Sequence, residues 1–282
     1  MSLFGKNQDK VYLLIDIGSG SLTVSFVLYK RNDLPVFLHT TTKDFIITSK
    51  PNGTKLFENM IKTLEGSLDE ITKEGRSHKY WKSKNSRIGG AVISFSSPWF
   101  MPKTKHIQIT EDKPFIISQK FIDGVVKQEE VILLGELNET SGVKEDFEVI
   151  EKNIVHMKIN GYVLKNYIGH KTNVFDAYLC MSVISQGVVN KIYDTVLRHT
   201  HIPKESILCH TFPLVSFSVL RDLYSNHSNF IIIDTTSEVT DITLIENDII
   251  SNTSSFPSGK NFVLREIAKS FGVSVEIAQS NL

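Results

Sequence analysis

The chain has 282 residues, a length typical of about two domains, and its hydrophobic content of 41% is enough to bury a sizeable core. Its formal net charge of zero does not favour nucleic acid, so the sequence predicts no nucleic-acid partner. No apolar run approaches the roughly 20 residues that span a bilayer, and the first ten residues contain no apolar signal core, so we expect a cytoplasmic protein.

Strands and one helix are predicted for the first 97 residues. Apolar residues alternate with smaller or polar ones in residues 11–30, which predicts two strands around a Gly-Ser-Gly turn. A third strand is expected over 35–45, and a buried strand over 87–97. Between them an amphipathic helix is predicted, because its apolar residues fall on one stripe: Phe57, Met60, Ile61, Leu64, Leu68 and Ile71.

Pro98 opens a segment of different character. Residues 104–117 predict a strand and a turn, and Ser118 is a candidate cap for a helix over 119–134. Residues 146–166 predict a long strand or a hairpin. Another strand is expected over 173–185.

The last hundred residues alternate between helices and strands. A helix is expected where apolar residues are spaced by four, at Val188, Ile192 and Val196. The further elements are a strand over 206–211, a helix over 212–224, a strand pair within 230–250, a helix over 260–272 ended by Gly272, and a helix starting near 274. The order strand–strand–strand–helix begins twice, near residue 11 and near residue 230.

The first strand pair encloses "DIGSGS", residues 16–21. Gly18 and Gly20 permit a tight turn and a close approach of the backbone to an oxyanion. Ser19 and Ser21 add hydroxyls and N–H donors, and loops of this kind bind anions. Asp16, at the strand end, is suited to a hydrated Mg²⁺ ion. Such turns also occur in plain hairpins, so this motif alone is weak.

A second strand–Asp–turn–strand occurs at "FIIIDTTSEVTDITLI". Asp234 ends its first strand, as Asp16 ends the first strand of the earlier pair. With this repeat the chain resembles the actin-like ATPase superfamily, in which two phosphate loops clamp a nucleotide. Within it the resemblance is to the branch of the bacterial cell-division protein FtsA and the type IV pilus assembly protein PilM. The order and spacing of the segments over 11–282 carry this resemblance, and no single motif is diagnostic.

The resemblance implies an α/β fold with mixed sheets, the actin-like ATPase (ribonuclease H-like) fold, with an inserted 1C-type subdomain and an incomplete second domain. ATP and Mg²⁺ are the implied cofactors, with at most slow ATP hydrolysis. Asp16 and Asp234 would position the metal and water. The implied nucleotide-binding residues are Gly18, Ser19, Gly20, Ser21, Thr236, Ser237 and Gly259.

The resemblance also implies a domain plan. The expected parts are 1–97 as the first part of subdomain 1A, 98–172 as the inserted 1C-like subdomain, 173–228 as the return of 1A, and 229–282 as the start of domain two. Residues 98–172 are the expected surface for protein partners or for self-association, in a peripheral complex at the inner face of the membrane.

The second loop departs from the pattern of the family, which usually has glycines after the aspartate. Thr236 and Ser237 stand in those places, and a threonine resists positive φ and brings a branched side chain toward the phosphates. Glu238 adds a negative charge beside them, unless its strand position directs it away. The family also continues past the segment that matches residue 282, through the adenosine loop. These departures leave a degenerate, non-nucleotide-binding interaction module open as an alternative, and a superfamily kinase or exopolyphosphatase as a third hypothesis.

Other features carry less functional information. Cys180 and Cys209 lie in apolar runs, which predicts buried free thiols and excludes a disulfide scaffold. The basic tract 73–87 is either a solvated connection or a patch for phosphates or an acidic partner. The histidines lack the spacing of a zinc site.

Overall fold

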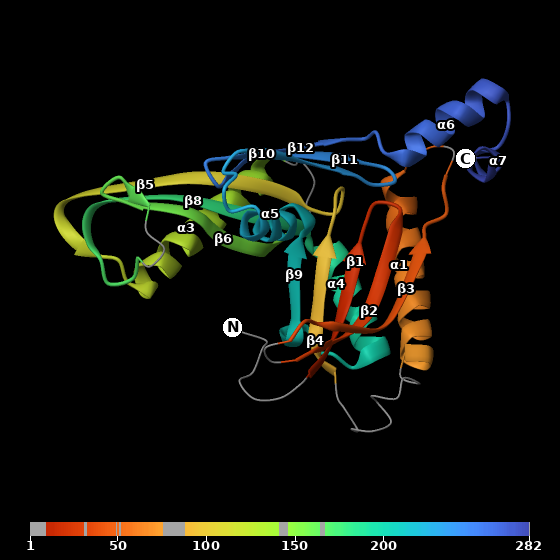
Figure 1. Cartoon of the computed structure of the whole chain (residues 1–282), viewed down its shortest axis with the longest axis horizontal. Coiled ribbons are helices and arrows are strands. Elements are labelled where there is room, and N and C mark those ends of the chain that lie inside the picture. The colour runs from red at the N-terminus through yellow and green to blue at the C-terminus, as the bar shows by residue number, and fades with distance from the viewer. Residues whose placement is uncertain are drawn as a thin grey trace.

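The structure, a computed structural model, describes residues 10–30, 33–48, 50, 52–75, 88–140, 146–163 and 167–281, and its strands form three sheets in those residues. The first sheet has the strand order β3-β2-β1-β4-β9 and stands upright in Figure 1. β1, β2 and β3 are antiparallel, whereas β4 runs parallel to β1 and β9 parallel to β4. The bounds are β1 (Lys10–Ile17), β2 (Ser21–Tyr29), β3 (Val36–Asp44), β4 (Ile88–Phe95) and β9 (Ile207–Thr211).

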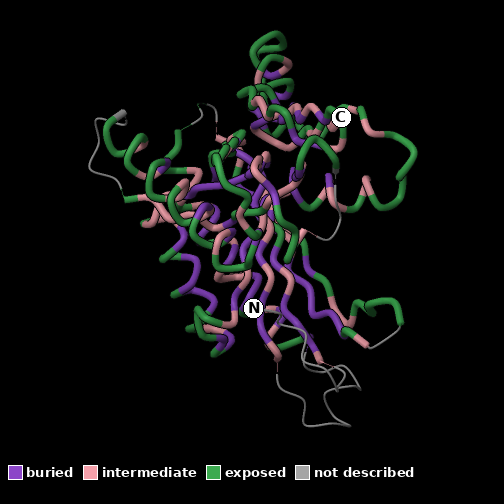
Figure 2. The backbone as a smooth tube through the Cα atoms, turned by 90° about the vertical axis from the view of Figure 1, so that its left-hand side faces the viewer, coloured by how far each residue is buried: buried purple, intermediate pink, exposed green. Residues whose placement is uncertain are grey.

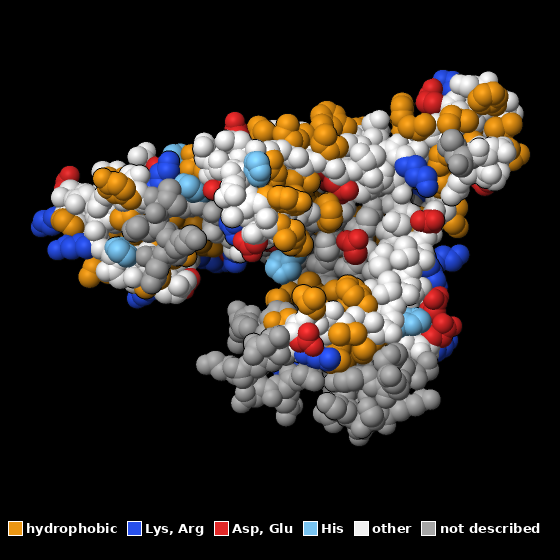
Figure 3. Space-filling model, in the orientation of Figure 1, with side chains coloured by type: hydrophobic (Ala, Val, Ile, Leu, Met, Phe, Trp, Pro, Cys, Tyr) orange, Lys and Arg blue, Asp and Glu red, His pale blue; other side chains and the backbone are white. Residues whose placement is uncertain are grey.

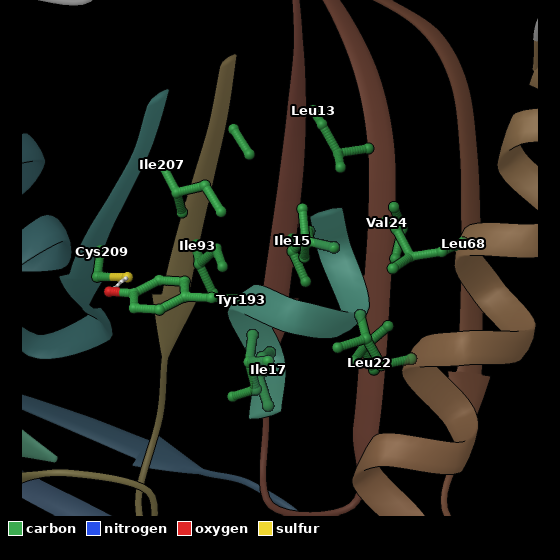
Figure 4. Packing of buried hydrophobic residues seen from close by; sticks show 14 of the residues in the cluster. Leu13, Ile15, Ile17, Leu22, Val24, Leu68, Ile93, Tyr193, Ile207 and Cys209 are labelled. Atoms are coloured by element: carbon green, nitrogen blue, oxygen red, sulfur yellow. Dashed lines mark hydrogen bonds between the residues drawn. The ribbon is translucent and has the colours of Figure 1, made fainter. Parts of the chain in front are cut away.

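Two helices, α1 and α4, cover one face of this sheet. Leu13, Ile15 and Ile17 of β1 point into that face and are at most 1% exposed. Figure 4 shows Leu68 of α1 and Tyr193 of α4 packed among these side chains. The sheet and its two helices are called the first lobe below. The helices are α1 (Gly53–Glu74) and α4 (Gln186–Thr200).

The apolar stripe predicted for α1 explains why this helix forms and how it docks. Its buried apolar residues are Met60, Ile61, Leu64, Leu68 and Ile71, each of which stabilises the fold by about 1.5–3 kcal/mol. The side chain of Asn52 caps the helix by accepting a hydrogen bond from the backbone N–H of Lys55 at 3.1 Å. The basic tract 73–87 follows, and residues 76–87 lie outside the described part of the chain.

The segment after Pro98 builds a second sheet with the order β5-β8-β6-β7, which extends sideways from the first lobe in Figure 1. Helix α3 packs beneath it, and Ser118 caps α3 by accepting a hydrogen bond from Phe121 N at 3.1 Å, as predicted. Residues 104–117 differ from the prediction of a strand and turn, because β5 continues through them to Ile116 along β8. The bounds are β5 (Met101–Ile116), α3 (Gln119–Thr140), β6 (Phe147–Ile159), β7 (Tyr162–Val163) and β8 (Lys171–Ser185).

The third sheet has the order β10-β11-β12 and lies across the upper end of the first lobe. One of its faces packs on α5 and β8, where Ile245 belongs to the same buried apolar cluster as Phe217 and Cys180. Helices α6 and α7 follow at its far end, and Gly272 ends α6 with a φ of 64°. This sheet, α6 and α7 are the second lobe. The bounds are α5 (Phe212–Leu223), β10 (Phe230–Thr235), β11 (Thr240–Glu246), β12 (Ile249–Phe256), α6 (Lys260–Phe271) and α7 (Val275–Ser280).

The two lobes repeat the order strand–strand–strand–helix, but they are buried to different degrees. Figure 2 shows long buried runs in the strands of the first lobe. In the second lobe, Ile231 and Ile233 of β10 remain 58% and 65% exposed, and Phe256 of β12 remains 48% exposed. Hydrophobic side chains accordingly gather along the upper edge of the molecule in Figure 3. Of the helices in the described ranges, none has the length and apolar character required to cross a membrane.

Candidate functional site

The turns of the two lobes meet, although they lie more than two hundred residues apart in the chain. The first turn joins β1 to β2 and the second joins β10 to β11. The hydroxyl of Ser19 lies 2.6 Å from the hydroxyl of Thr236, and the backbone N–H of Glu238 donates to the hydroxyl of Ser19 at 2.7 Å. The structure thus brings together the two segments in which the sequence predicts phosphate loops.

Local contacts fix the first turn. The backbone N–H of Gly18 donates to the carbonyl of Ser21 at 3.0 Å, which closes the turn. The indole N–H of Trp99, just past β4, donates to the carbonyl of Gly18 at 2.8 Å. The N–H of Phe45 donates to the carbonyl of Gly20 at 2.8 Å. The turn is therefore rigidly placed, and Ser19 at its tip is fully buried against the second lobe.

The hydroxyls between the turns form a directional chain of hydrogen bonds. Thr236 donates its hydroxyl proton to the carbonyl of Val239 at 2.8 Å, so its oxygen accepts from Ser19. Ser19 in turn accepts from Glu238 N–H. Every proton in this chain has an acceptor, which is the favourable arrangement for buried polar groups.

Two glycines of the site allow protein segments to approach each other closely. A Cβ built on Gly20 would overlap the Cβ of Ser237 in the opposite turn. A Cβ built on Gly259, the residue before α6, would overlap the backbone of Thr236 and Ser237. Neither position therefore has room for a larger residue: the space beside Gly20 is filled by a side chain of the second lobe, and the space beside Gly259 by the backbone of the second turn.

A charged cluster supports the second turn from behind. The guanidinium of Arg265 on α6 forms two hydrogen bonds with the carboxylate of Glu238, at 2.9 and 2.6 Å, and both side chains are largely buried. Asn261 donates to the same carboxylate at 2.8 Å. The Nε of Arg265 donates to the carbonyl of Thr48 in the segment after β3, at 2.9 Å. The ion pair of the second lobe is thereby tied to the first.

Three acidic side chains, Asp16, Asp234 and Asp241, lie in the strands next to the turns. Asp16 reaches solvent but lies in a recess among protein atoms, so burial raises its pKa, against a hydrogen bond from Ser94 that lowers it. Burial raises the pKa of Asp234, and the negative charges of Asp241 and Asp16 raise it further. Asp241 is 3% exposed, and one of its carboxylate oxygens has no hydrogen-bond partner within the described part of the chain.

The described residues include no group of three or more His, Cys, Asp or Glu side chains that could hold a metal ion. Asp16 and Asp234 offer two carboxylates of the kind that Mg²⁺ takes together with waters. Their predicted role in metal binding stays a prediction.

The donors of the second turn are not available to the phosphates of ATP in this arrangement. A phosphate site needs N–H and hydroxyl donors that face open space. Here the donors are satisfied by protein acceptors: Glu238 N–H by Ser19, Thr236 N–H by Val239, Lys260 N–H by Thr236, and Asn261 N–H by Ser237. The N-terminal N–H groups of α6 are thus used on the second turn itself.

Sequence reasoning located the two turns but missed the cluster behind them. Glu238 stands out in the sequence because it is a charged residue in a phosphate-loop position. The sequence does not determine whether its side chain points toward the loop or away from it. Its partner Arg265 stands 27 positions later. The available signal was an arginine one turn into a helix that starts beside the loop. Trp99 carried no such signal, because its indole contact depends on the path of the chain after β4.

A second candidate site is a groove along β6. One cavity of about 510 Å³ lies on the α3 side, and one of about 400 Å³ lies on the α5 side. Asn153 and Ile154 of β6 line both cavities, so the two adjoin this strand from either side and are together called the groove along β6. β7 pairs with β6 only at Lys158 and Ile159, which leaves the preceding edge of β6 without a strand partner in the described part of the chain.

The groove combines apolar and charged side chains. Val126, Leu214, Val215 and Val219 provide apolar surface. Lys127, Lys152 and Arg221 add positive charge, with Asp123 as the acidic residue on the α3 side. At the α5 side His210 is oriented through a 3.0 Å contact between its Nδ1 and the buried carboxylate of Glu151, which also accepts the hydroxyl proton of Thr211 at 2.7 Å.

Comparisons with known proteins were made by sequence and by fold. Neither a protein-family model nor a curated protein matches the sequence. A chain of a structure described as a PilM–PilN type IV pilus biogenesis complex has a TM-score of 0.56 and 14% identity, covering 95% of this chain and 68% of its own length. At that identity the likeness establishes the fold alone.

Two other solved structures are similar to a lower degree. A Bacteroides thetaiotaomicron protein with an actin-like ATPase fold has a TM-score of 0.45 and 14% identity, covering 94% of this chain and 78% of its own. The ethanolamine utilization protein EutJ from Carboxydothermus hydrogenoformans has a TM-score of 0.43 and 11% identity, covering 98% and 61%. The chain has the predicted α/β architecture with mixed sheets and the actin-like ATPase fold, of the kind seen with PilM.

Proposed function

We propose that this protein is an assembly scaffold with an actin-like ATPase fold that acts through protein partners, in the manner of PilM or FtsA. The groove along β6 is the observation that carries this proposal. An unpaired strand edge between two cavities offers main-chain hydrogen bonds together with pockets for side chains, which suits an extended polypeptide. Fold likeness alone would not carry a function.

The chemistry of the groove indicates what kind of partner it takes. Valines and leucine line its α5 side, so a bound segment gains from apolar side chains. The basic lining residues Lys127, Lys152 and Arg221 are balanced by acidic ones, because Asp123 and Glu151 also line the groove and Glu130 pairs with both lysines. The proposed partner is therefore a polypeptide segment with apolar residues.

The proposal extends to the domain plan and the location. The parts would be 1–97 and 173–228 as subdomain 1A, 98–172 as the inserted partner-binding subdomain, and 229–282 as the start of domain two. The β6 edge lies within 98–172. The complex would be a peripheral assembly at the cytoplasmic face of the membrane, in pilus assembly or cell division. The PilM neighbour was solved in a complex with PilN, which supports a role through partners.

A second candidate function is Mg·ATP binding by the same scaffold, with at most slow hydrolysis. The repulsion between Asp16 and Asp234 favours it, because a divalent cation would relieve that repulsion. It requires the two turns to separate. Isothermal titration with Mg·ATP at millimolar concentration tests it: a saturable heat would support this candidate, and a flat trace would remove it.

Photocrosslinking tests the partner groove. A photoreactive amino acid at Val219, which lines the groove from α5, should crosslink one cellular protein. The same probe at Val126, across the groove on α3, should capture the same protein. Leu223 is a matched control, since it lies on α5, is 69% exposed and lies outside the groove lining. Equal capture from Leu223, or different proteins from the two groove positions, would contradict the proposal.

A further inference from the structure

We propose that the protein closes its two lobes with its own side chains in place of a nucleotide. The interlobe latch, defined as Ser19, Thr236, Glu238, Arg265 and the carbonyl of Thr48, is the ligand-like element. The inference rests on the proposed scaffold function and specifies its regulation: partner binding at the β6 groove is independent of ATP.

The hydrogen bonds between the two turns are complete without a ligand. The chain runs from Glu238 N–H to Ser19, from Ser19 to Thr236, and from Thr236 to the carbonyl of Val239. The hydroxyl of Ser19 therefore takes the N–H that a phosphate oxygen would need. A phosphate entering here would leave Ser19 and Thr236 without these partners, and unsatisfied buried polar groups are costly.

The carboxylate of Glu238 occupies the position of a bound anion. The carboxylate of Glu238 is bound by the two-pronged guanidinium of Arg265 and by Asn261, the geometry in which proteins also bind phosphate. With Arg265 and Asn261 committed to Glu238, the positive charge of Arg265 is neutralised from within the second lobe. An additional anion that approached Arg265 would meet the carboxylate of Glu238.

Arg265 of this ion pair also connects the second lobe to the first. Arg265 is largely buried, and its remaining Nε donates to the carbonyl of Thr48 in the first lobe. Beside it, Ile47 packs against the apolar cluster of α6 and α7, which includes Leu264 and Ala268. Hydrogen bonding and apolar packing therefore act at the same junction, and neither needs a ligand.

Amide hydrogen exchange tests the latch directly. The N–H of Glu238 donates to Ser19 of the other lobe, whereas the N–H of Asn261 donates to Ser237 of its own lobe at 2.7 Å. Without nucleotide, we expect the Glu238 amide to be protected, and added Mg·ATP should leave its rate unchanged. Free exchange at Glu238 without nucleotide, or protection that appears only with Mg·ATP, would overturn the inference.

Variants separate closure from folding. Ser19→Ala should accelerate exchange at Glu238 on the order of tenfold, the loss expected for one hydrogen bond, while the Asn261 amide keeps its rate. Arg265→Lys retains the charge but loses the forked geometry, and it should accelerate exchange at Glu238 in the same direction. An unchanged Glu238 rate in both variants would refute the latch.

The two proposals can fail separately. Crosslinking from Val219 to the partner should persist in the Ser19→Ala variant and should be unaffected by Mg·ATP. A crosslink that forms only with Mg·ATP would contradict the proposal that partner binding is independent of ATP, whereas the proposal that the partner binds in the groove would still hold. No crosslink from Val219 under any condition, with a protected Glu238 amide, would overturn the groove and leave the latch intact.

Discussion

Ile15 and Ile233 occupy the same position in the hairpins of the two lobes, each directly before the aspartate that is the second-last residue of its strand, yet they are 1% and 65% exposed. In the first lobe α1 and α4 cover the face to which Ile15 belongs. In the second lobe the corresponding face of β10 is open to solvent within the described part of the chain. Repeated sequence patterns thus lead to unequal burial.

This difference predicts unequal costs for the same substitution. Ile15→Ala should lower the free energy of unfolding by about 2–5 kcal/mol, because it removes buried methyl groups and leaves a cavity. Ile233→Ala should change it by less than about 0.5 kcal/mol, since most of that side chain already contacts water. Urea unfolding followed by circular dichroism measures both, and equal costs would mean that the face of β10 is covered in solution.

The sequence was sufficient for most of the elements, although β5 is continuous where a turn was predicted and β12 was not located. The pairing of the two turns was implied by the resemblance to the actin-like ATPases. Alternation predicted β1 and β2, and spacing by three and four predicted α1, because each pattern reflects burial on one face. Contacts between residues that only the tertiary fold brings together could not be predicted from the sequence. The 2.6 Å contact of Ser19 with Thr236 joins residues 217 positions apart, and local pattern carries no information on that distance. The ion pair of Glu238 and Arg265 was missed for the same reason.

The ion pair behind the second turn should contribute measurably to stability. Glu238→Gln removes the charge that Arg265 and Asn261 bind, and it leaves a largely buried guanidinium without its counterion. We expect a loss of about 1–3 kcal/mol in the free energy of unfolding. Glu246→Gln, an exposed site on β11 with the same change of charge, is the control and should stay within about 0.5 kcal/mol. A loss at Glu238 no larger than that of the control would contradict the importance of the pair.

The two cysteines should be inert in the folded protein. Burial raises the pKa of Cys180 and of Cys209 to about 11, and Cys209 also lies 3.3 Å from the hydroxyl of Tyr193 (Figure 4). Because the thiolate is the nucleophile, reaction with a disulfide reagent at pH 8 should be slower than for free cysteine on the order of a hundredfold. Both thiols should react promptly in urea. Rapid reaction of either thiol without urea would show that its strand opens locally.

The same shifts predict a loss of stability at high pH. The unfolded chain releases its thiol protons above about pH 8.5, while the folded chain keeps them up to about pH 11. The stabilisation that comes from keeping the two thiols protonated is therefore complete below about pH 8.5 and is lost as the pH rises to about 11. The double variant Cys180→Ala, Cys209→Ala should show a flatter decline in melting temperature over that range. An equally steep decline would assign the effect to other groups.

Removal of the charge at Asp234 should stabilise the protein at neutral pH. Burial and the charges of Asp241 and Asp16 raise the pKa of Asp234, so its ionised form is disfavoured in the folded state. When the pKa of a group is higher in the folded chain than in the unfolded chain, the protonated group stabilises the fold. This stabilisation is complete at a pH below the pKa in the unfolded chain, and it is lost as the pH rises through the pKa in the folded chain. Asp234→Asn should therefore melt higher than the wild type at pH 7, and the advantage should shrink toward pH 3.

Asp222→Asn is the control for this measurement, because Asp222 is well exposed at the end of α5, and its melting temperature should follow the wild type across the range. The same melting temperatures should also be measured with added Mg²⁺. If Asp16 and Asp234 bind the ion, Mg²⁺ should raise the melting temperature of the wild type and leave Asp234→Asn unchanged. An Asp234→Asn protein that melts lower than the wild type at pH 7 would show that the carboxylate has a stabilising partner, and the repulsion inferred from Asp16 and Asp241 would then be wrong.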